Sequence, residues 1–252
     1  MKANPSLRHL SVGAPWEIFR APNLNRTSWL YTKAGNLGLY SSEIILMPDY
    51  NVGFTVLAAG QLSHNNVRIL SDMLAAIFVP GLKAAAKEEA EQVYAGTYTG
   101  PIGTNSSMTV VTDDNPGLGI TQWNLNGTDV FPLIGTIYGA TPDQLAQLQV
   151  SVRLYPTGLQ SADGTKVAWR AVYGLFPEQL DPGAFSENCI SWMKVDSVIY
   201  RGLGADEFLF NLETNADGSK AVSIEPRVLR TQLQKAGGTS GVGKLARKGF
   251  QA

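Results

Sequence analysis

The first clear pattern in the chain is a set of three β-strand segments between residues 28 and 60. Two of them, Ser28 to Ala34 and Tyr40 to Met47, are partly apolar, and the third, Val52 to Ala59, is almost continuously apolar. Glycine-containing and Pro-Asp turn sequences separate them, which favours antiparallel neighbours. A continuous apolar run is typical of a strand buried on both faces. The segments therefore predict the edge-to-centre part of an antiparallel sheet.

A helical pattern follows the third strand. The chain predicts a helix from Asn65, a candidate N-cap, to Phe78, and Pro80-Gly81 predicts an interruption because proline cannot donate a helical hydrogen bond. Leu82 to Val93 predicts a second helical piece with a charged outer face. We expect these helices to cover the sheet and to lead to a second domain. The apolar positions with helical spacing in the first piece are Val67, Leu70, Leu74, Ile77 and Phe78.

From Tyr94 to Arg230 the chain consists of short β segments separated by turn sequences. Asp163-Gly164 and Asp217-Gly218 lie between alternating segments and are strong hairpin signals. Thr141 to Gln147 predicts a single helical turn. Regular strands with very little helix predict an antiparallel β-barrel or sandwich. The predicted strands are Tyr94–Thr99, Ser107–Thr112, Gly119–Leu125, Val130–Tyr138, Leu148–Tyr155, Lys166–Tyr173, Ile190–Arg201, Glu207–Thr214 and Lys220–Ile224.

These patterns divide the chain into four regions of a mixed α+β protein. Residues 1–10 are expected to be a cut or flexible N-terminus, and residues 11–93 a partial antiparallel sheet with its helix. Residues 94–230 form the predicted all-β domain. Residues 231–252 are small, basic and aperiodic, which predicts a flexible tail.

The composition narrows the function classes. Charged residues make up 16% of the chain and the net charge is −1, so we expect no basic surface for nucleic acid or an anionic membrane. No apolar run approaches the ~20 residues of a membrane span, and the first residues lack the apolar core of a signal peptide. The one cysteine, Cys189, excludes an intrachain disulfide and a cysteine-based metal site. We expect neither a metal nor another cofactor.

One short motif connects the first strand with a known family. Lys33-Ala34-Gly35 lies at the end of that strand and is followed by a glycine-broken turn and a strand that ends in Pro48-Asp49. This arrangement resembles the third signature of the serine β-lactamase and penicillin-binding-protein superfamily, and within it the class C-like fungal β-lactamase-like proteins with an appended C-terminal β domain. Val12 to Arg20 resembles the preceding sheet strand, and Tyr94 to Tyr98 resembles the entry to the appended domain.

The resemblance implies roles for four residues of this strand. The Lys33 ammonium would hold the hydrogen-bond network of the nucleophile and base and attract a substrate carboxylate, here as a vestigial catalytic residue. Gly35 would let an acyl substrate lie along the strand edge, and the N–H of Asn36 would be one of two oxyanion donors. Ala34 stands where the family usually has Ser or Thr, which argues against hydrolysis of lactams. Without the resemblance, Lys33 would be an ordinary exposed lysine.

The other two signatures of the superfamily are expected upstream of the lysine strand. Only 32 residues precede Lys33, too few for the S-x-x-K and Y-x-N motifs in their usual places. We therefore expect the C-terminal part of a longer hydrolase that cleaves an ester, amide or peptide through an acyl-enzyme, and no activity of this chain alone. The alternative is a non-catalytic protein whose β domain binds a ligand or a partner chain. We also expect self-association through an exposed sheet edge.

Two further sets of motifs bear on function and location. Ser191 and Lys194 fit S-x-x-K, but they follow Lys33 and lie in a segment that alternates like a strand, so no catalytic role is expected. Three N-x-S/T sequons, at Asn25, Asn105 and Asn126, lie in loop-like positions. They fit the extracellular location that the family resemblance implies. The lack of a signal peptide argues against secretion of this chain.

Overall fold

The computed structural model describes residues 2–3, 10–21, 28–147, 149–176, 190–216 and 218–237 of the chain. The chain divides into two compact units. The first, which we call the sheet unit, comprises Met1–Gln92 and Thr112–Pro116. The second, the barrel unit, comprises Val93–Val111 and Gly117–Ala252. Each unit has its own set of buried apolar side chains.

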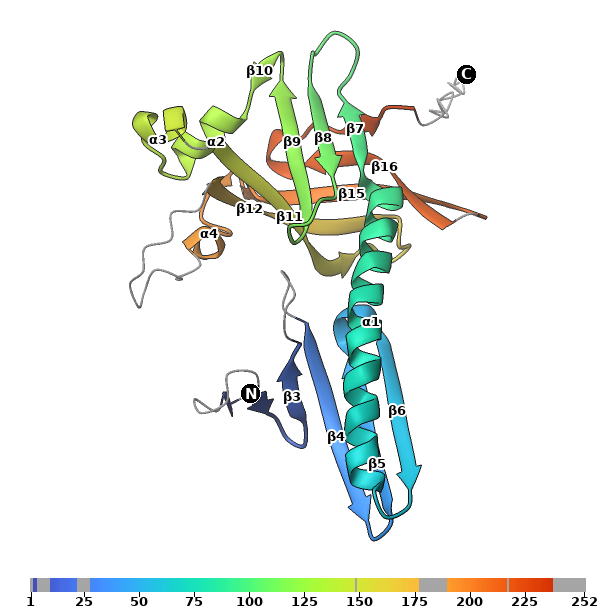
Figure 1. The fold of residues 1–252 in the computed structure, drawn as a ribbon. Coiled ribbons are helices and arrows are strands. Elements are labelled where there is room, and N and C mark those ends of the chain that lie inside the picture. Colours follow the sequence, from blue (N-terminus) through green and yellow to red (C-terminus); the bar gives the residue numbers. More distant parts are fainter. Residues whose placement is uncertain are drawn as a thin grey trace. The chain divides into compact units, whose positions relative to one another are not determined.

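The sheet unit contains six antiparallel strands in the order β1-β2-β3-β4-β5-β6 (Figure 1). Each strand pairs with its neighbour in sequence, as expected when connections are short. The three predicted strands are confirmed as β4, β5 and β6, and the 3-10 helix η1 (Pro48–Tyr50) joins the last two. The strands are β1 (Lys2–Ala3), β2 (Leu10–Val12), β3 (Glu17–Arg20), β4 (Trp29–Leu37), β5 (Tyr40–Met47) and β6 (Val52–Ala59).

The prediction that the last of these strands is buried on both faces is wrong. β6 is the edge strand of the described sheet, and its burial alternates along the strand, with Val56 buried and Leu57 74% exposed. One side of the sheet faces a helix and forms a core around Leu30 and Ile45. In the described part of the unit no helix covers the opposite side, so the apolar residues of β6 on that side face solvent.

Helix α1 (Ser63–Tyr94) is one continuous helix of 32 residues, so the predicted interruption at Pro80-Gly81 is wrong. Pro80 lies inside the helix, where it cannot donate a backbone hydrogen bond. Val79, next to it, is buried in the sheet core, and Leu82 packs against the same cluster. This packing offsets the missing hydrogen bond and keeps the helix continuous through the proline.

Because α1 is continuous, it contains a longer apolar stretch than expected from the sequence. One 18-residue window of this helix is long and apolar enough to cross a membrane, with a mean hydropathy of 1.6 and 11% of the window buried. The expectation that no apolar stretch approaches the length of a membrane span does not hold for this helix. Length and composition alone carry little weight, because the core helices of soluble proteins and signal sequences pass the same test.

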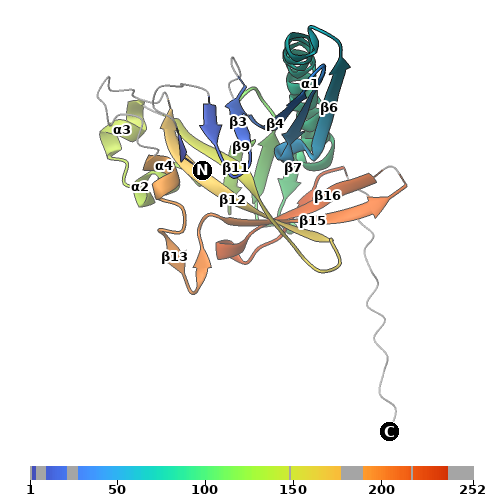
Figure 2. The ribbon, with the colours of Figure 1, turned by 90° about the horizontal axis from the view of Figure 1, so that it is seen from below.

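The barrel unit is built on a nine-stranded antiparallel sheet in the order β10-β9-β11-β12-β15-β16-β17-β7-β8 (Figure 2). β8 also pairs with β9, so eight of these strands close into a ring. The ninth strand, β10, lies outside the ring and pairs with β9. The mixed α+β class is confirmed, and the β domain is a barrel. The strands are β7 (Gly96–Thr99), β8 (Ser107–Val111), β9 (Leu118–Leu125), β10 (Thr128–Asp129), β11 (Gln149–Gln160), β12 (Lys166–Phe176), β15 (Glu207–Asn215), β16 (Gly218–Pro226) and β17 (Leu233–Lys235).

Aromatic side chains fill the interior of the barrel. Tyr98, Phe208 and Phe210 are fully buried. The ring of Phe210 lies 4.9 Å from that of Tyr94 and 5.7 Å from that of Trp169, measured between centroids. An eight-stranded barrel has an interior just wide enough for side chains to fill. The interior is therefore a packed core.

The strand predicted over residues 130–138 is wrong, because the segment forms helix α2 (Phe131–Ile137). Pro132 lies in the first turn of this helix, where proline is well tolerated. A short apolar run does not distinguish helix from strand by its periodicity, which explains the error. The helical turn predicted next is confirmed as α3 (Pro142–Gln147), and the Thr141 hydroxyl caps it.

Two further corrections concern the end of the chain. The strand predicted over residues 190–201 begins instead as helix α4 (Ile190–Met193), and only its end is a strand, β13 (Ile199–Tyr200), which pairs with β14 (Leu203–Gly204). The predicted flexible tail starts too early, because β17 pairs with β16 and β7 and buries Leu233. Three residues are too short a pattern to identify as a strand from sequence. Residues 238–252 of that tail lie outside the described residues.

Candidate functional site

The second half of strand β4 has an open edge. β3 pairs with Trp29 to Thr32, and the described residues place no strand on that side of Lys33 to Leu37. On the other side, β4 pairs with β5 up to the pair Leu37–Tyr40, which flanks a two-residue turn. Residues flanking such a turn are hydrogen-bonded to each other, and the pattern then alternates along the strands. The N–H groups of Ala34 and Asn36 therefore point toward the open edge.

Lys33 is the first residue of this open half, and its ammonium is paired. Nζ donates to Glu17 Oε1 at 2.7 Å, with the two side chains 46% and 40% exposed. Glu17 begins β3 and lies opposite Thr32, one residue before Lys33. Lys33 thus lies on the predicted strand, but the strand continues to Leu37 instead of ending at Ala34. The ion pair with Glu17 was not predicted from the sequence.

The two faces of β4 differ at this end of the sheet. Side chains alternate between the faces of a strand, so Asn36 lies on the side covered by α1 and Gly35 lies on the uncovered side. Asn36 Oδ1 lies 3.3 Å from Nδ1 of His64 near the start of α1. The hydroxyls of Ser41 and Ser63 form a buried hydrogen bond of 3.0 Å. These polar contacts fix the start of α1 against the ends of β4 and β5.

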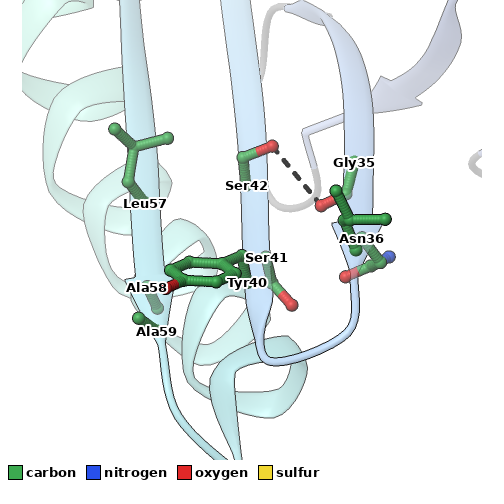
Figure 3. Close-up of a pocket in the computed structure, with 9 residues that line it drawn as sticks. Gly35, Asn36, Tyr40, Ser41, Ser42, Leu57, Ala58 and Ala59 are labelled. Carbon is green, nitrogen blue, oxygen red and sulfur yellow. Dashed lines mark hydrogen bonds between the residues drawn. The ribbon is translucent and has the colours of Figure 1, made fainter.

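An open groove of about 620 Å³ lies on the uncovered side of the sheet at this end (Figure 3). Its volume is within the range of small-molecule sites. Gly35 keeps the strand surface clear, because a Cβ there would lie 2.9 Å from the hydroxyl oxygen of Ser42. Ser42 Oγ donates to the Gly35 carbonyl at 3.4 Å. The lining residues are Gly35, Asn36, Leu37, Tyr40, Ser41, Ser42, Leu57, Ala58 and Ala59.

The groove contains part of the predicted site and adds residues from neighbouring strands. Gly35 and Asn36 line it, whereas Lys33-Ala34, the two residues before them, do not. Reasoning from the sequence missed Ser42 and Leu57. A signal for them existed, because the strand register pairs Gly35 with Ser42 and Ser42 with Leu57 in one row across three strands. That register follows from the two turns, which the sequence did identify.

The S-x-x-K motif in the barrel unit does not form a comparable site. Ser191 lies in helix α4, contrary to the predicted strand. Lys194 Nζ donates to the Tyr138 carbonyl oxygen at 2.5 Å, so its ammonium is bound to the residue that follows α2. This contact gives Lys194 a structural role. The helical placement of Ser191 removes the strand argument against catalysis, so the absence of a catalytic role stays a prediction.

The main cluster of charges in the barrel unit surrounds Arg170. Its Nη1 lies 2.9 Å from Oδ1 of the fully buried Asp206 and 2.5 Å from Oδ1 of Asp196. Burial, and then the charge of Asp206, raise the pKa of Tyr138 nearby to about 12. The cluster fastens the segment after α4 to β12. In the part of the chain that the structure describes, no group of three His, Cys, Asp or Glu side chains is placed to hold a metal ion.

Two of the three sequons lie in described turns. Asn105 and Asn126 are exposed and have φ values of 45° and 51°. Their turns are neighbours, because the Gly127 N–H donates to the Asn105 carbonyl at 2.9 Å. Both residues are accessible, and glycosylation stays a prediction. Asn25 and Cys189 lie outside the described residues.

Residues 86–237 match a family model described as "Beta-lactamase-like-like, C-terminal domain". A beta-lactamase-like protein of Arthroderma benhamiae is 29% identical over 255 residues, which cover 92% of this chain and 42% of that protein. Probable hydrolase clz13 of Cochliobolus lunatus is 29% identical over 234 residues, which cover 86% of this chain and 36% of that protein. Probable hydrolase M10 of a Phoma species is 35% identical over 135 residues, which cover 50% of this chain and 22% of that protein. No solved structure matches.

The chain thus spans less than half the length of these curated relatives. The matched region begins within α1 and ends at the last described residue after β17, so it includes the whole closed barrel. The matches confirm the similarity to fungal β-lactamase-like proteins that the lysine strand and the entry to the β domain indicated. Two of the relatives are named as probable hydrolases, and their names state no substrate.

Proposed function

Because the chain belongs to the family of beta-lactamase-like C-terminal domains, we propose that it supplies one wall of the active site of a serine-type acyl hydrolase. That wall is the open half of β4. A serine hydroxyl from outside this chain attacks the carbonyl carbon of an ester or amide, and the alcohol or amine leaves with the proton. Water then attacks the acyl-enzyme, which releases the acid and restores the serine.

The row of groups along the open edge of β4 is the observation that supports this proposal. The N–H of Asn36 points toward that edge, where it can stabilise a developing oxyanion. Gly35, just before it, leaves the strand surface clear, and Lys33, whose ammonium is paired with Glu17, places an N–H donor at the start of the row. A substrate lying along the edge would pass all three residues in turn, with its carbonyl group at the Asn36 N–H.

The mass and N-terminus of the protein from its native source test the proposal first. We expect a polypeptide heavier than 27.1 kDa that reacts with a fluorophosphonate probe, which modifies activated serines. In that polypeptide, Lys33→Ala should lower kcat/KM for a p-nitrophenyl ester by roughly 100-fold or more. Lys166→Ala, which removes an exposed lysine of the barrel, should leave kcat/KM unchanged. A native product of 27.1 kDa that the probe does not label would favour a non-catalytic binding protein instead.

A further inference from the structure

The groove beside β4 is electrically neutral. None of its nine lining residues carries a charged side chain. Lys33, the cation closest to it on the strand, is paired with Glu17 at 2.7 Å. A substrate carboxylate near this pair would be attracted by Lys33 and repelled by Glu17, and opposite charges so close together leave little net field for an anion. The described lining of the groove thus supplies no free cation to a carboxylate.

The walls of the groove are apolar. Tyr40 is 68% exposed, and Leu57, on the neighbouring strand β6, is similarly exposed. Leu37 lies opposite Tyr40 in the ladder, and Ala59 lies on its other side. The polar side-chain groups on this side of the sheet are the hydroxyls of Ser42 and Tyr40, because Asn36 and Ser41 direct theirs toward α1 (Figure 3). Apolar walls with few polar groups are typical of small-molecule sites, and an exposed aromatic ring can stack on an apolar substituent.

We infer that this groove holds the apolar acyl group of an uncharged ester and that it discriminates against substrates with a free carboxylate. The inference rests on the proposed function, because it assigns the groove to the acyl side of the substrate. Glu17 is the specificity-determining residue, since it occupies the Lys33 ammonium that would otherwise attract a carboxylate. Ala34 agrees with this assignment, because it has no hydroxyl with which to bind one.

Ligand-observed magnetic resonance on the 252-residue chain tests this inference, with methyl phenylacetate and phenylacetate as matched neutral and anionic probes. We expect the ester to bind at least roughly threefold more tightly than the anion. Leu57→Asp should weaken ester binding roughly tenfold, because it places a charge in an apolar wall. Leu159→Asp makes the same change at an exposed leucine of the barrel and should leave ester binding unchanged.

Glu17→Gln tests the charge argument separately. The substitution removes the negative charge beside Lys33 and keeps the side-chain shape, so phenylacetate should bind roughly three- to tenfold more tightly while ester binding is unchanged. Phenylacetate binding as tightly as the ester to the unsubstituted chain would overturn the inference. So would ester binding that Leu57→Asp does not weaken.

These binding measurements need no nucleophile and are therefore independent of serine labelling. If the probe labels the native protein but the chain does not bind the ester selectively, only the inferred substrate class is rejected. If the chain binds the ester selectively but the probe does not label the native protein, only the hydrolase proposal is rejected.

Discussion

The barrel unit and the sheet unit bury their apolar surface in different ways. In the barrel unit, pairing of β8 with β9 closes the ring, and aromatic side chains fill the interior. In the sheet unit, β6 has a free edge, β4 is open along its second half, and one side of the sheet has no helix in the described residues. The barrel is thus self-contained, whereas the sheet unit offers backbone groups and apolar side chains to another molecule. This contrast is why we place the site on the sheet unit.

Helix α1 shows the same contrast within one element. Val67 and Val79 are buried on its sheet-facing side. Ile69, Met73 and Ile77 recur every four residues and are exposed, which forms a second apolar stripe. Contiguous exposed apolar surface marks interaction sites or causes association. Self-association of the chain, which we expected through the sheet edge, stays a prediction, and this stripe adds a second surface that could take part.

The largest effect that separates the two units is expected from truncating a core aromatic side chain. Phe210→Ala should lower the free energy of unfolding by about 3–5 kcal/mol, because the ring is fully buried and packs against Tyr94 and Trp169. Ile44→Ala, on the uncovered side of the sheet, should cost less than about 1 kcal/mol. Urea unfolding followed by tryptophan fluorescence and circular dichroism measures both. Similar losses for the two variants would mean that the uncovered side of the sheet is in fact buried in solution.

A pair of glycines tests the same contrast at the level of the backbone. Gly117, in the barrel unit, has φ +74°, and an added Cβ would lie 2.5 Å from the carbonyl oxygen of Leu154. Gly117→Ala should therefore cost about 3 kcal/mol, from backbone strain and a contact that cannot relax cheaply. Gly38, in the turn after β4, has φ +59°, and an added Cβ there would have no neighbouring atom within 4 Å. Gly38→Ala should cost about 1 kcal/mol from backbone strain alone. Equal losses in urea unfolding would show that packing at Gly117 adapts.

Local turn chemistry accounts for the parts of the fold that the sequence predicted well. The bounds of β5 and β6 agree with the predicted segments because Gly38 and the Pro48-Asp49 turn delimit them. The Asp163-Gly164 hairpin joins β11 and β12 as expected, with Asp163 Oδ1 accepting the N–H of Thr165. Such signals involve residues a few positions apart. They are therefore readable without knowing the tertiary structure.

The features that the sequence did not predict depend on contacts between distant residues. The helix through Pro80 is stabilised by packing on strands more than 30 positions earlier, at Leu30 and Ile45. The Lys33–Glu17 ion pair depends on the register of β3 against β4, which the sequence did not define. β17 is a strand because β16 and β7 lie on either side of it. The site was thus predicted as a strand and a lysine, but not as a neutral groove.

The smallest effect we expect to distinguish the units is the response of the barrel to alkaline pH. Burial raises the pKa of Tyr98 well above 10, and it raises the pKa of Tyr173 likewise. A phenol whose pKa is raised by folding stabilises the folded state fully below its ordinary pKa of about 10, and this contribution is lost as the pH rises through the folded value. The free energy of unfolding of the barrel should therefore fall progressively above pH ~10.

Tyr98→Phe separates this effect from packing. Below pH ~10 the variant should be about 0.5–1.5 kcal/mol less stable, because it loses the hydrogen bond of 2.6 Å from the Tyr98 hydroxyl to the Tyr94 carbonyl. Above that pH the loss should shrink, because the variant has no phenol to ionise on unfolding. Tyr40→Phe changes an exposed tyrosine of the groove and should leave the pH profile unaltered. If Tyr40→Phe shifted the profile as much as Tyr98→Phe, Tyr40 would have to be buried in solution, and the uncovered side of the sheet would have a partner there.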